Sequence, residues 1–149
     1  TSTTSYQAVL ADGQTAPLTR LTLVPSPTAG EAAPPPPNFI FFKLTDPPAS
    51  EGAKWSALAL VKTPISIGQT VIALGFSDRS DINVSVGIVS SLLSAADAST
   101  TPFVMTNAAS VENQGGPLMN IKGEVVGISQ RAGIAVSAEA IAAALADLK

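Results

Sequence analysis

The sequence contains no cysteine and no histidine. Without cysteine the chain can form no disulfide, thiol nucleophile or cysteine-based zinc site, and without histidine it can supply no imidazole as a general base. Charge is also sparse, because only 13% of the residues are charged, the eight lysines and arginines are scattered singly, and the net charge is −3. We therefore expect no basic patch that could neutralise phosphates, and no nucleic-acid partner.

Long apolar runs are missing as well. The strongest ones, residues 38–44 and 71–76, are far shorter than the roughly 20 residues that a membrane-spanning helix needs. We therefore expect no membrane partner. Residues 1–7 are polar and uncharged, so that any signal peptide was removed or was never present. The lack of cysteine fits either redox compartment and leaves the localisation open.

Turn-forming residues are abundant, since 12 prolines and 11 glycines separate short apolar segments. Residues 6–24 are predicted to form two strands around the turn dipeptide Asp12-Gly13. Residues 25–37 contain four consecutive prolines, which favours a surface connector; a ligand for a proline-recognising domain is the alternative. Further strands are predicted at 38–44, 56–62, 69–75, 81–91, 103–106 and 124–129. This number of short strands predicts an all-β body.

Two segments carry a clear periodicity. In residues 81–91, apolar and small residues alternate as in a strand, with Ile82, Val84, Val86 and Ile88 on one side and Asn83, Ser85 and Gly87 on the other. Residues 138–148 are instead predicted to form a helix, with Ser137 as its cap and a narrow apolar stripe made of Ile141, Leu145 and Leu148. We expect this helix to pack against the β body.

The most informative segment is residues 103–129, FVMTNAASVENQGGPLMNIKGEVVGIS. It contains, in order, TNAA at 106–109, GGPL at 115–118 and GEVVGI at 123–128. This order and spacing resemble the active-site segment of the trypsin-like serine peptidases, above all those of the HtrA/DegP type. The segments IGQTVIALG, VSVGIVS and NFIFFKL are similar to that family's strands before this loop and to the strand that carries its catalytic aspartate.

The resemblance covers most of residues 6–148 and implies a trypsin-like double β-barrel with a C-terminal α-helix. It divides a single domain into a partial first barrel at 1–62, a second barrel at 63–136 and the helix at 137–149. A complete domain of this fold runs to about 200 residues, so the strands that would carry the histidine are expected to be absent. The incomplete first barrel would then expose strand edges, which a second copy, an N-terminal segment or the proline-rich loop would cover.

The chain departs from the family at each catalytic side chain. Gln114 stands where the resemblance places the nucleophilic serine, Asn38 where it places the carboxylate, and Glu112 where a glycine supplies the first oxyanion amide. A carboxamide cannot form an acyl-enzyme, and an asparagine cannot stabilise an imidazolium ion. We therefore expect a catalytically inactive pseudo-peptidase.

Other chemistries have weaker support. Ser110 could act as a nucleophile, but nothing in the sequence places Lys122 or another lysine as its base. Glu112 and Asp97 could form a pair of acids, although nothing marks them as buried or close. The acids of the SDRSD segment, Asp78 and Asp81, lack the spacing of a calcium loop. We expect no metal and no cofactor.

A binding groove is the more plausible remnant of the peptidase. In the family, substrate lies beside the segments that correspond to 128–130 and to the loop 107–114, and it pairs as an added strand. The expected binding residues are Asn107, Asn113, Gln114, Gly115, Ile128, Ser129 and Gln130. The amide of Gln114 would either bond a bound peptide or plug the pocket, and the sequence leaves both open.

Three functions follow from these residues. The first is a module that binds a peptide or protein segment, and the second is a structural subunit of a homo-oligomer or assembly. The third is a serine endopeptidase completed by a histidine-bearing segment outside this chain, against which Gln114 argues. The resemblance favours a periplasmic or secreted location, while the compartment itself stays unknown.

Overall fold

The computed structural model describes residues 5–10, 13–21, 40–45, 57–76, 81–93, 103–146 and 148. Its elements are β1 (Tyr6–Val9), β2 (Thr15–Leu21), β3 (Phe41–Leu44), β4 (Thr70–Phe76), β5 (Ile82–Leu93), β6 (Phe103–Thr106), the 3-10 helix η1 (Val111–Asn113), β7 (Pro117–Asn120), β8 (Val125–Arg131), β9 (Ile134–Ser137) and α1 (Ala138–Ala146). Several predicted features lie outside the described residues, namely Asp12, the proline-rich segment 25–37, Asn38, Asp78, Asp97 and Lys149.

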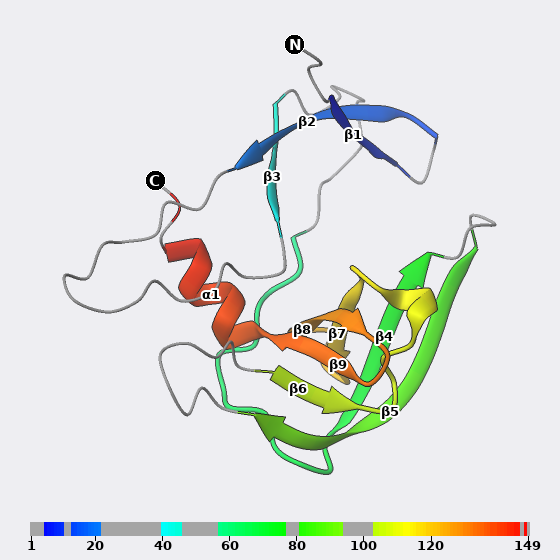
Figure 1. Cartoon of the computed structure of the whole chain (residues 1–149), viewed down its shortest axis with the longest axis vertical. Helices are drawn as coiled ribbons and strands as arrows, with labels where there is room; N and C mark the ends of the chain where they lie inside the picture. The colour runs from blue at the N-terminus through cyan, green and yellow to red at the C-terminus, as the bar shows by residue number, and fades with distance from the viewer. Residues whose placement is uncertain are drawn as a thin grey trace.

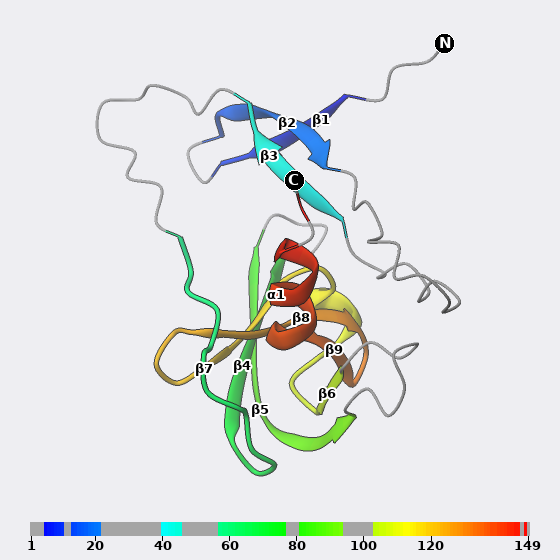
Figure 2. The ribbon, with the colours of Figure 1, turned by 90° about the vertical axis from the view of Figure 1, so that its left-hand side faces the viewer.

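The strands form two separate sheets (Figure 1, Figure 2). β1, β2 and β3 make a three-stranded antiparallel sheet in that order, and the other six strands close into a barrel in the order β4-β5-β6-β9-β8-β7. The predicted fold class, mostly β with a closed barrel and a helix near the C-terminus, is confirmed. Within the described residues, β1 and β3 are open edges of the smaller sheet, as expected for an incomplete first barrel.

The smaller sheet begins with the predicted hairpin. β1 pairs with β2 from Tyr6↔Leu18 to Val9↔Thr15, and Gly13 in the connection has a φ of 80°, which glycine adopts without steric cost. The ring of Tyr6 packs against that of Phe42 on β3, with centroids 4.9 Å apart. The hairpin predicted from the turn dipeptide is therefore confirmed.

The core of the barrel is thin and filled mainly by small and β-branched side chains. On β4 the alternation places Val71 and Ala73 in the interior, where both are fully buried. The core cluster consists of Val71, Ala73, Val89, Val104, Ala108, Leu118, Val126 and Ala135. A barrel of six strands is narrow, so these small side chains are enough to fill its interior.

The strand predicted at 56–62 is wrong. Among the described residues of that segment, 57–62, only Leu60 makes a β-bridge, and it does so to Val125. The N–H of Val61 donates to the carbonyl of Val125, and the N–H of Val125 donates to the carbonyl of Ala59, at 2.9 and 2.8 Å. β8 already pairs with β7 on one side and with β9 on the other. Segment 57–62 can therefore pair only at Val125, the first residue of β8, where the β7–β8 register is irregular.

β5 turns its apolar residues outward. Ile82, Val84, Val86 and Ile88 are all exposed, whereas Asn83, Ser85 and Gly87 on the other side are partly buried. The polar side faces the loop between β6 and β7, which supplies hydrogen-bond partners for it. The alternation predicted the strand correctly, and the loop explains why the polar side is the covered one.

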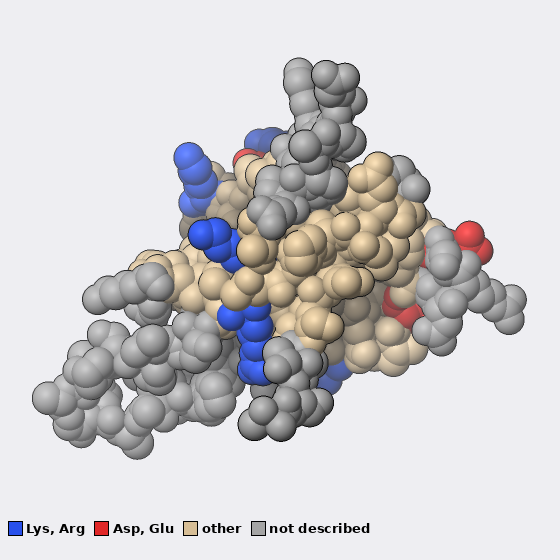
Figure 3. Space-filling model, turned by 90° about the horizontal axis from the view of Figure 1, so that it is seen from above, with Lys and Arg blue, Asp and Glu red and all other residues tan. Residues whose placement is uncertain are grey.

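α1 begins at Ala138 as predicted, and the hydroxyl of Ser137 accepts the N–H of Ala140 at 3.2 Å as its cap. The helix ends at Ala146, and it packs against β8 and β9, with Ile141 buried. In the part of the chain that the structure describes, no helix is long and apolar enough to cross a membrane. Seen from the side of the three-stranded sheet, the described part of the surface is mostly uncharged, with a few basic and acidic side chains (Figure 3).

Candidate functional site

The loop between β6 and β7, residues 107–116, carries the peptidase-like motif and is held against the barrel wall. Its 3-10 turn, η1, contacts β4 and β5. Gly75 on β4 makes this approach feasible, because a Cβ there would overlap the Cα of Asn113 and lie 2.7 Å from the carbonyl oxygen of Glu112. The backbone of the loop therefore rests directly on the backbone of β4.

Asn113 is the anchor of this loop. Its side chain is fully buried, and its Oδ1 accepts the N–H of Ser110 at 2.8 Å. Its Nδ2 donates to the Oγ of Ser85 at 2.8 Å and to the carbonyl of Ala108 at 3.2 Å. The hydroxyl of Ser85 in turn donates to the same carbonyl at 2.6 Å. Both amide hydrogens and the oxygen are satisfied, so this network specifies one conformation of the loop.

Two further bonds join the loop to β5. The Oδ1 of Asn107 accepts the N–H of Ile88 at 2.9 Å, and the Nδ2 of Asn83 donates to Oε2 of Glu112 at 2.7 Å. Gly87 leaves space for Asn107, since a Cβ at that position would overlap the Asn107 Oδ1. β5 thus supports the loop between Asn107 and Asn113.

The end of the loop is bonded to β8. The N–H of Gly115 donates to the carbonyl of Ser129 at 2.7 Å, and the N–H of Ser129 donates to the carbonyl of Gly116 at 2.9 Å. Gly115 has a φ of 79°. Between Asn113 and this glycine, Gln114 is exposed, and its carboxamide makes no hydrogen bond to the described residues. The residue that we expect at the nucleophile's place therefore lies at the surface of a loop that is hydrogen-bonded at both ends.

Ser129 carries a hydroxyl that is buried and unpaired. The residue is 1% exposed, and among the described residues its Oγ has no hydrogen-bond partner. Leaving such a group unpaired costs about 1–3 kcal/mol. It lies on β8 between Ile128 and Gln130, which are both half-buried.

Five of the seven expected binding residues fall into two adjoining groups, whereas the side chains of Asn107 and Asn113 bond β5. Gln114 and Gly115 lie at the end of the loop, and Ile128, Ser129 and Gln130 lie on the strand to which that end is bonded. The Asn113 side chain is turned into the barrel wall, where it positions the loop, and Glu112 is exposed beside Asn83. Among the described residues, no three acidic side chains come together as metal ligands would.

The sequence did not single out Asn83 and Ser85 as members of the site. Both lie 28 or 29 residues before their partners in the chain. The only signal was the polar side of the alternating segment 81–91, which is equally typical of a solvent-facing strand side. No local pattern distinguishes the two cases.

Comparison with protein families gives a match to the model of the trypsin-like peptidase domain over residues 3–128. Among curated proteins, the chain is similar to a probable periplasmic serine endoprotease of DegP-like type from Ectopseudomonas mendocina, with 41% identity over 69 residues. This match covers 45% of the chain and 15% of the relative. A DegP-like protein from a Marinomonas species is 42% identical over 66 residues, which are 43% of the chain and 14% of that protein. The match thus spans only a small part of these relatives.

Solved structures show the same fold. The MamO protease domain from Magnetospirillum magneticum matches with a TM-score of 0.64 and 21% identity, covering 93% of the chain and 73% of that domain. The HtrA-type protease AlgW, solved with a decapeptide, matches with a TM-score of 0.69 and 20% identity, covering 96% of the chain and 44% of that structure. At these identities the likeness is one of fold.

Proposed function

Because this chain belongs to the trypsin-like peptidase domain family, whose model it matches over residues 3–128, we propose that it is an inactive member that binds a peptide or protein segment. Gln114 carries the proposal. It stands at the nucleophile's place in the motif, it is exposed, and the loop around it is fixed by the buried bonds of Asn113. The loop that the family uses for catalysis is kept, and the reacting side chain is not.

The inactivity follows from what acyl transfer requires. A hydroxyl must attack the scissile carbonyl, an imidazole must take its proton, and backbone amides must bind the developing oxyanion. This chain has no histidine, and Gln114 offers a carboxamide in place of the hydroxyl. Glu112, at the place of the oxyanion glycine, adds a carboxylate where negative charge would develop.

We expect no covalent labelling of this chain by a fluorophosphonate probe, which reacts only with an activated serine. Mass spectrometry of the intact protein after incubation measures this, with an active serine peptidase of the same family as the positive control. An adduct on any serine of the chain, Ser110 and Ser129 included, would show that a nucleophile is activated and that the chain is an enzyme.

The binding surface is supported by the backbone of β8. Pairing between β7 and β8 ends at Pro117↔Ile128, after which only the Gly115–Gly116 turn bonds that side of the strand, at Ser129. No described strand pairs with Gln130 on that side. An extended peptide could add there as a strand, with backbone bonds providing its affinity.

Peptide binding is expected to shift a limited set of amide signals. When a randomised decapeptide pool is titrated into the isotope-labelled chain, we expect the largest changes in the NMR spectrum at Gln114, Gly115, Ser129 and Gln130. Amides of Val84 and Val86, on the outward side of β5, serve as the internal control. Shifts centred on β5, or no saturable shift at millimolar peptide, would contradict the proposed site.

The second candidate, a structural subunit, is favoured by the open edges of β1 and β3 among the described residues. A partner strand on either edge would complete the smaller sheet. For the location, we extend to this chain the periplasmic description of its DegP-like relatives. Peptide affinity, measured at constant oligomeric state, distinguishes the two candidate functions. Only a peptide-binding module loses its function when peptide pairing at β8 is blocked.

A further inference from the structure

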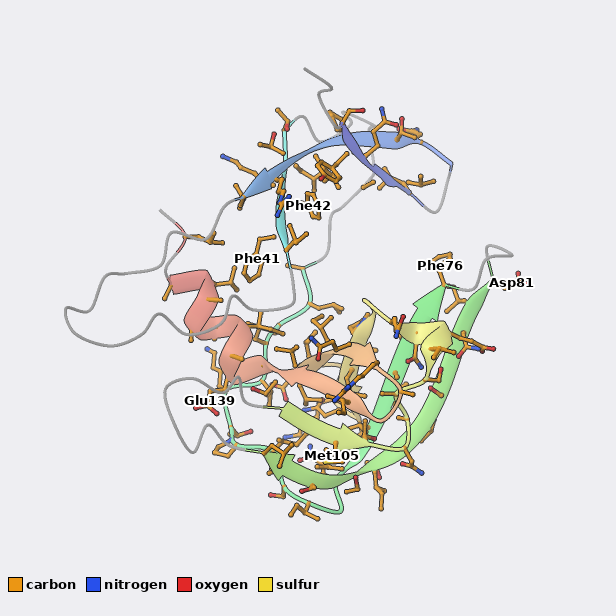
Figure 4. All side chains as sticks on the ribbon, viewed as in Figure 1. Phe41, Phe42, Phe76, Asp81, Met105 and Glu139 are labelled. Atoms are coloured by element: carbon orange, nitrogen blue, oxygen red, sulfur yellow. The ribbon has the colours of Figure 1, made fainter. Side chains whose placement is uncertain are left out.

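The outward side of the β4–β5 hairpin is an apolar surface of the barrel. The register pairs Ile72↔Val86, Leu74↔Val84 and Phe76↔Ile82, with Thr70↔Ile88 at one end. We call these seven apolar residues the outer face: Ile72, Leu74, Phe76, Ile82, Val84, Val86 and Ile88. Figure 4 shows Phe76 and Asp81 at the same end of the hairpin.

The outer face is exposed over a continuous area. Phe76, Ile82, Val84, Val86 and Ile88 are between 49% and 70% exposed. Together they offer on the order of 500 Å² of apolar surface, which is at the upper end of what a monomer exposes. By contrast, the opposite wall, β8 and β9, is covered by α1.

The composition of the outer face restricts its partner. Neither β4 nor β5 contains an ionisable residue, and Thr70 is the only polar side chain in the four rows. A charged or strongly polar partner would lose hydration there without gaining a bond. Because the backbones of β4 and β5 already pair with each other along these rows, we place the partner on the face of the sheet.

From these observations we propose that the occupant is a second copy of this chain, packed outer face to outer face about a two-fold axis. The outer face is apolar, mostly β-branched and uncharged, so a second copy of the same surface offers it the kind of partner that it requires, as an isologous interface does. A standard interface buries about 800 Å² per partner, of which somewhat more than half is apolar. The outer face supplies that apolar share.

Such a dimer leaves the proposed peptide site free. The loop 107–116 and the outer face lie on opposite sides of β5, since the loop bonds Asn83 and Ser85 on its inward side. The two proposals are therefore independent. A monomer that still binds peptide overturns only the dimer, and a dimer that binds none overturns only the peptide site.

The test compares two identical substitutions at exposed valines, Val84 at 59% and Val9 at 75% exposure. Val84 lies in the middle of the outer face, and Val9 lies on β1 in the other sheet. We expect the unmodified chain to sediment at twice its mass of 15.0 kDa at micromolar concentration. Val84→Lys should weaken dimerisation about 100-fold, because each dimer would bury two ammonium groups, while Val9→Lys should leave it unchanged.

Lysine also lowers the magnitude of the net charge of −3, so general repulsion between copies cannot explain a loss of dimer. If Val84→Lys fails to fold, methyl NMR of the unmodified chain replaces it, with the Val84 and Val86 signals expected to shift with protein concentration and those of Val9 to stay constant. A monomeric unmodified chain, a dimer that Val84→Lys leaves intact, or a dimer that Val9→Lys disrupts would each overturn the proposal.

Discussion

A Gly75→Ala variant is expected to lose about 3 kcal/mol or more of its free energy of unfolding and to melt on the order of 10 °C lower. The added Cβ would overlap the Cα of Asn113 and approach the carbonyl oxygen of Glu112 within 2.7 Å. Both contacts are to backbone or to the root of a side chain, so no rotamer change relieves them. The loop would have to move off β4 and break the bonds of Asn113 to Ser85 and Ser110.

Gly123→Ala is the matched control, because it makes the same chemical change at a glycine with open space around it. Gly123 has a φ of 80°, and nothing lies within 4 Å of an added Cβ. Its cost is therefore the conformational strain alone, about 1 kcal/mol. Urea denaturation followed by circular dichroism measures both variants. Equal losses would mean that the loop does not rest on β4 as described.

Most strands could be predicted because their signal is local. β6 was predicted with its observed bounds, and β4 and β5 within one or two residues, since alternation and β-branched runs are properties of the segment itself. β7 and β9 were not predicted from their own residues. Each is only four residues long, and both depend on distant partners, β4 for the first and β6 for the second. Closure of the barrel, which no local pattern encodes, is what makes them strands.

The candidate site divides in the same way. The motif located Gln114, Gly115 and the loop between β6 and β7, because that information lies in consecutive residues. What holds the loop could not be read from the sequence, since Ser85 meets Asn113 only after β5 has folded against η1. The alternating pattern predicted β5 as a strand with one apolar and one polar side. It did not indicate that the loop would cover the polar side.

These contacts hold the loop without the help of the side chain at position 114. Its conformation depends on Asn113, Asn107 and the polar side of β5, and none of these bonds involves the side chain of Gln114. Position 114 is therefore free to change without loss of fold. The residues that fix the loop's geometry are thus separate from position 114.

Asn113→Ala should consequently lower the free energy of unfolding by about 2–3 kcal/mol, although Asn113 contacts no proposed ligand. Alanine removes the acceptor for the N–H of Ser110 and the donors to Ser85 and Ala108, all in a fully buried position. The partly buried N–H of Ser110 then loses its partner. We also expect the amide signals of Gln114 and Gly115 to broaden, because the loop no longer has one fixed conformation.

Asn113→Asp distinguishes the hydrogen bonds from the packing, because it keeps the shape of the side chain. The variant retains the oxygen that accepts the N–H of Ser110. Its other oxygen would face the carbonyl of Ala108, to which Nδ2 of Asn113 donates at 3.2 Å in the unmodified chain. Burial raises the pKa of the introduced carboxyl above its value in the unfolded chain. The variant should therefore be closest to the unmodified chain below about pH 4, where the carboxyl is protonated and can donate, and should lose stability as the pH rises through the raised pKa. Urea midpoints of both proteins between pH 3 and 8 measure this difference, and a gap that does not change with pH would show that the amide donors of Asn113 do not hold the loop.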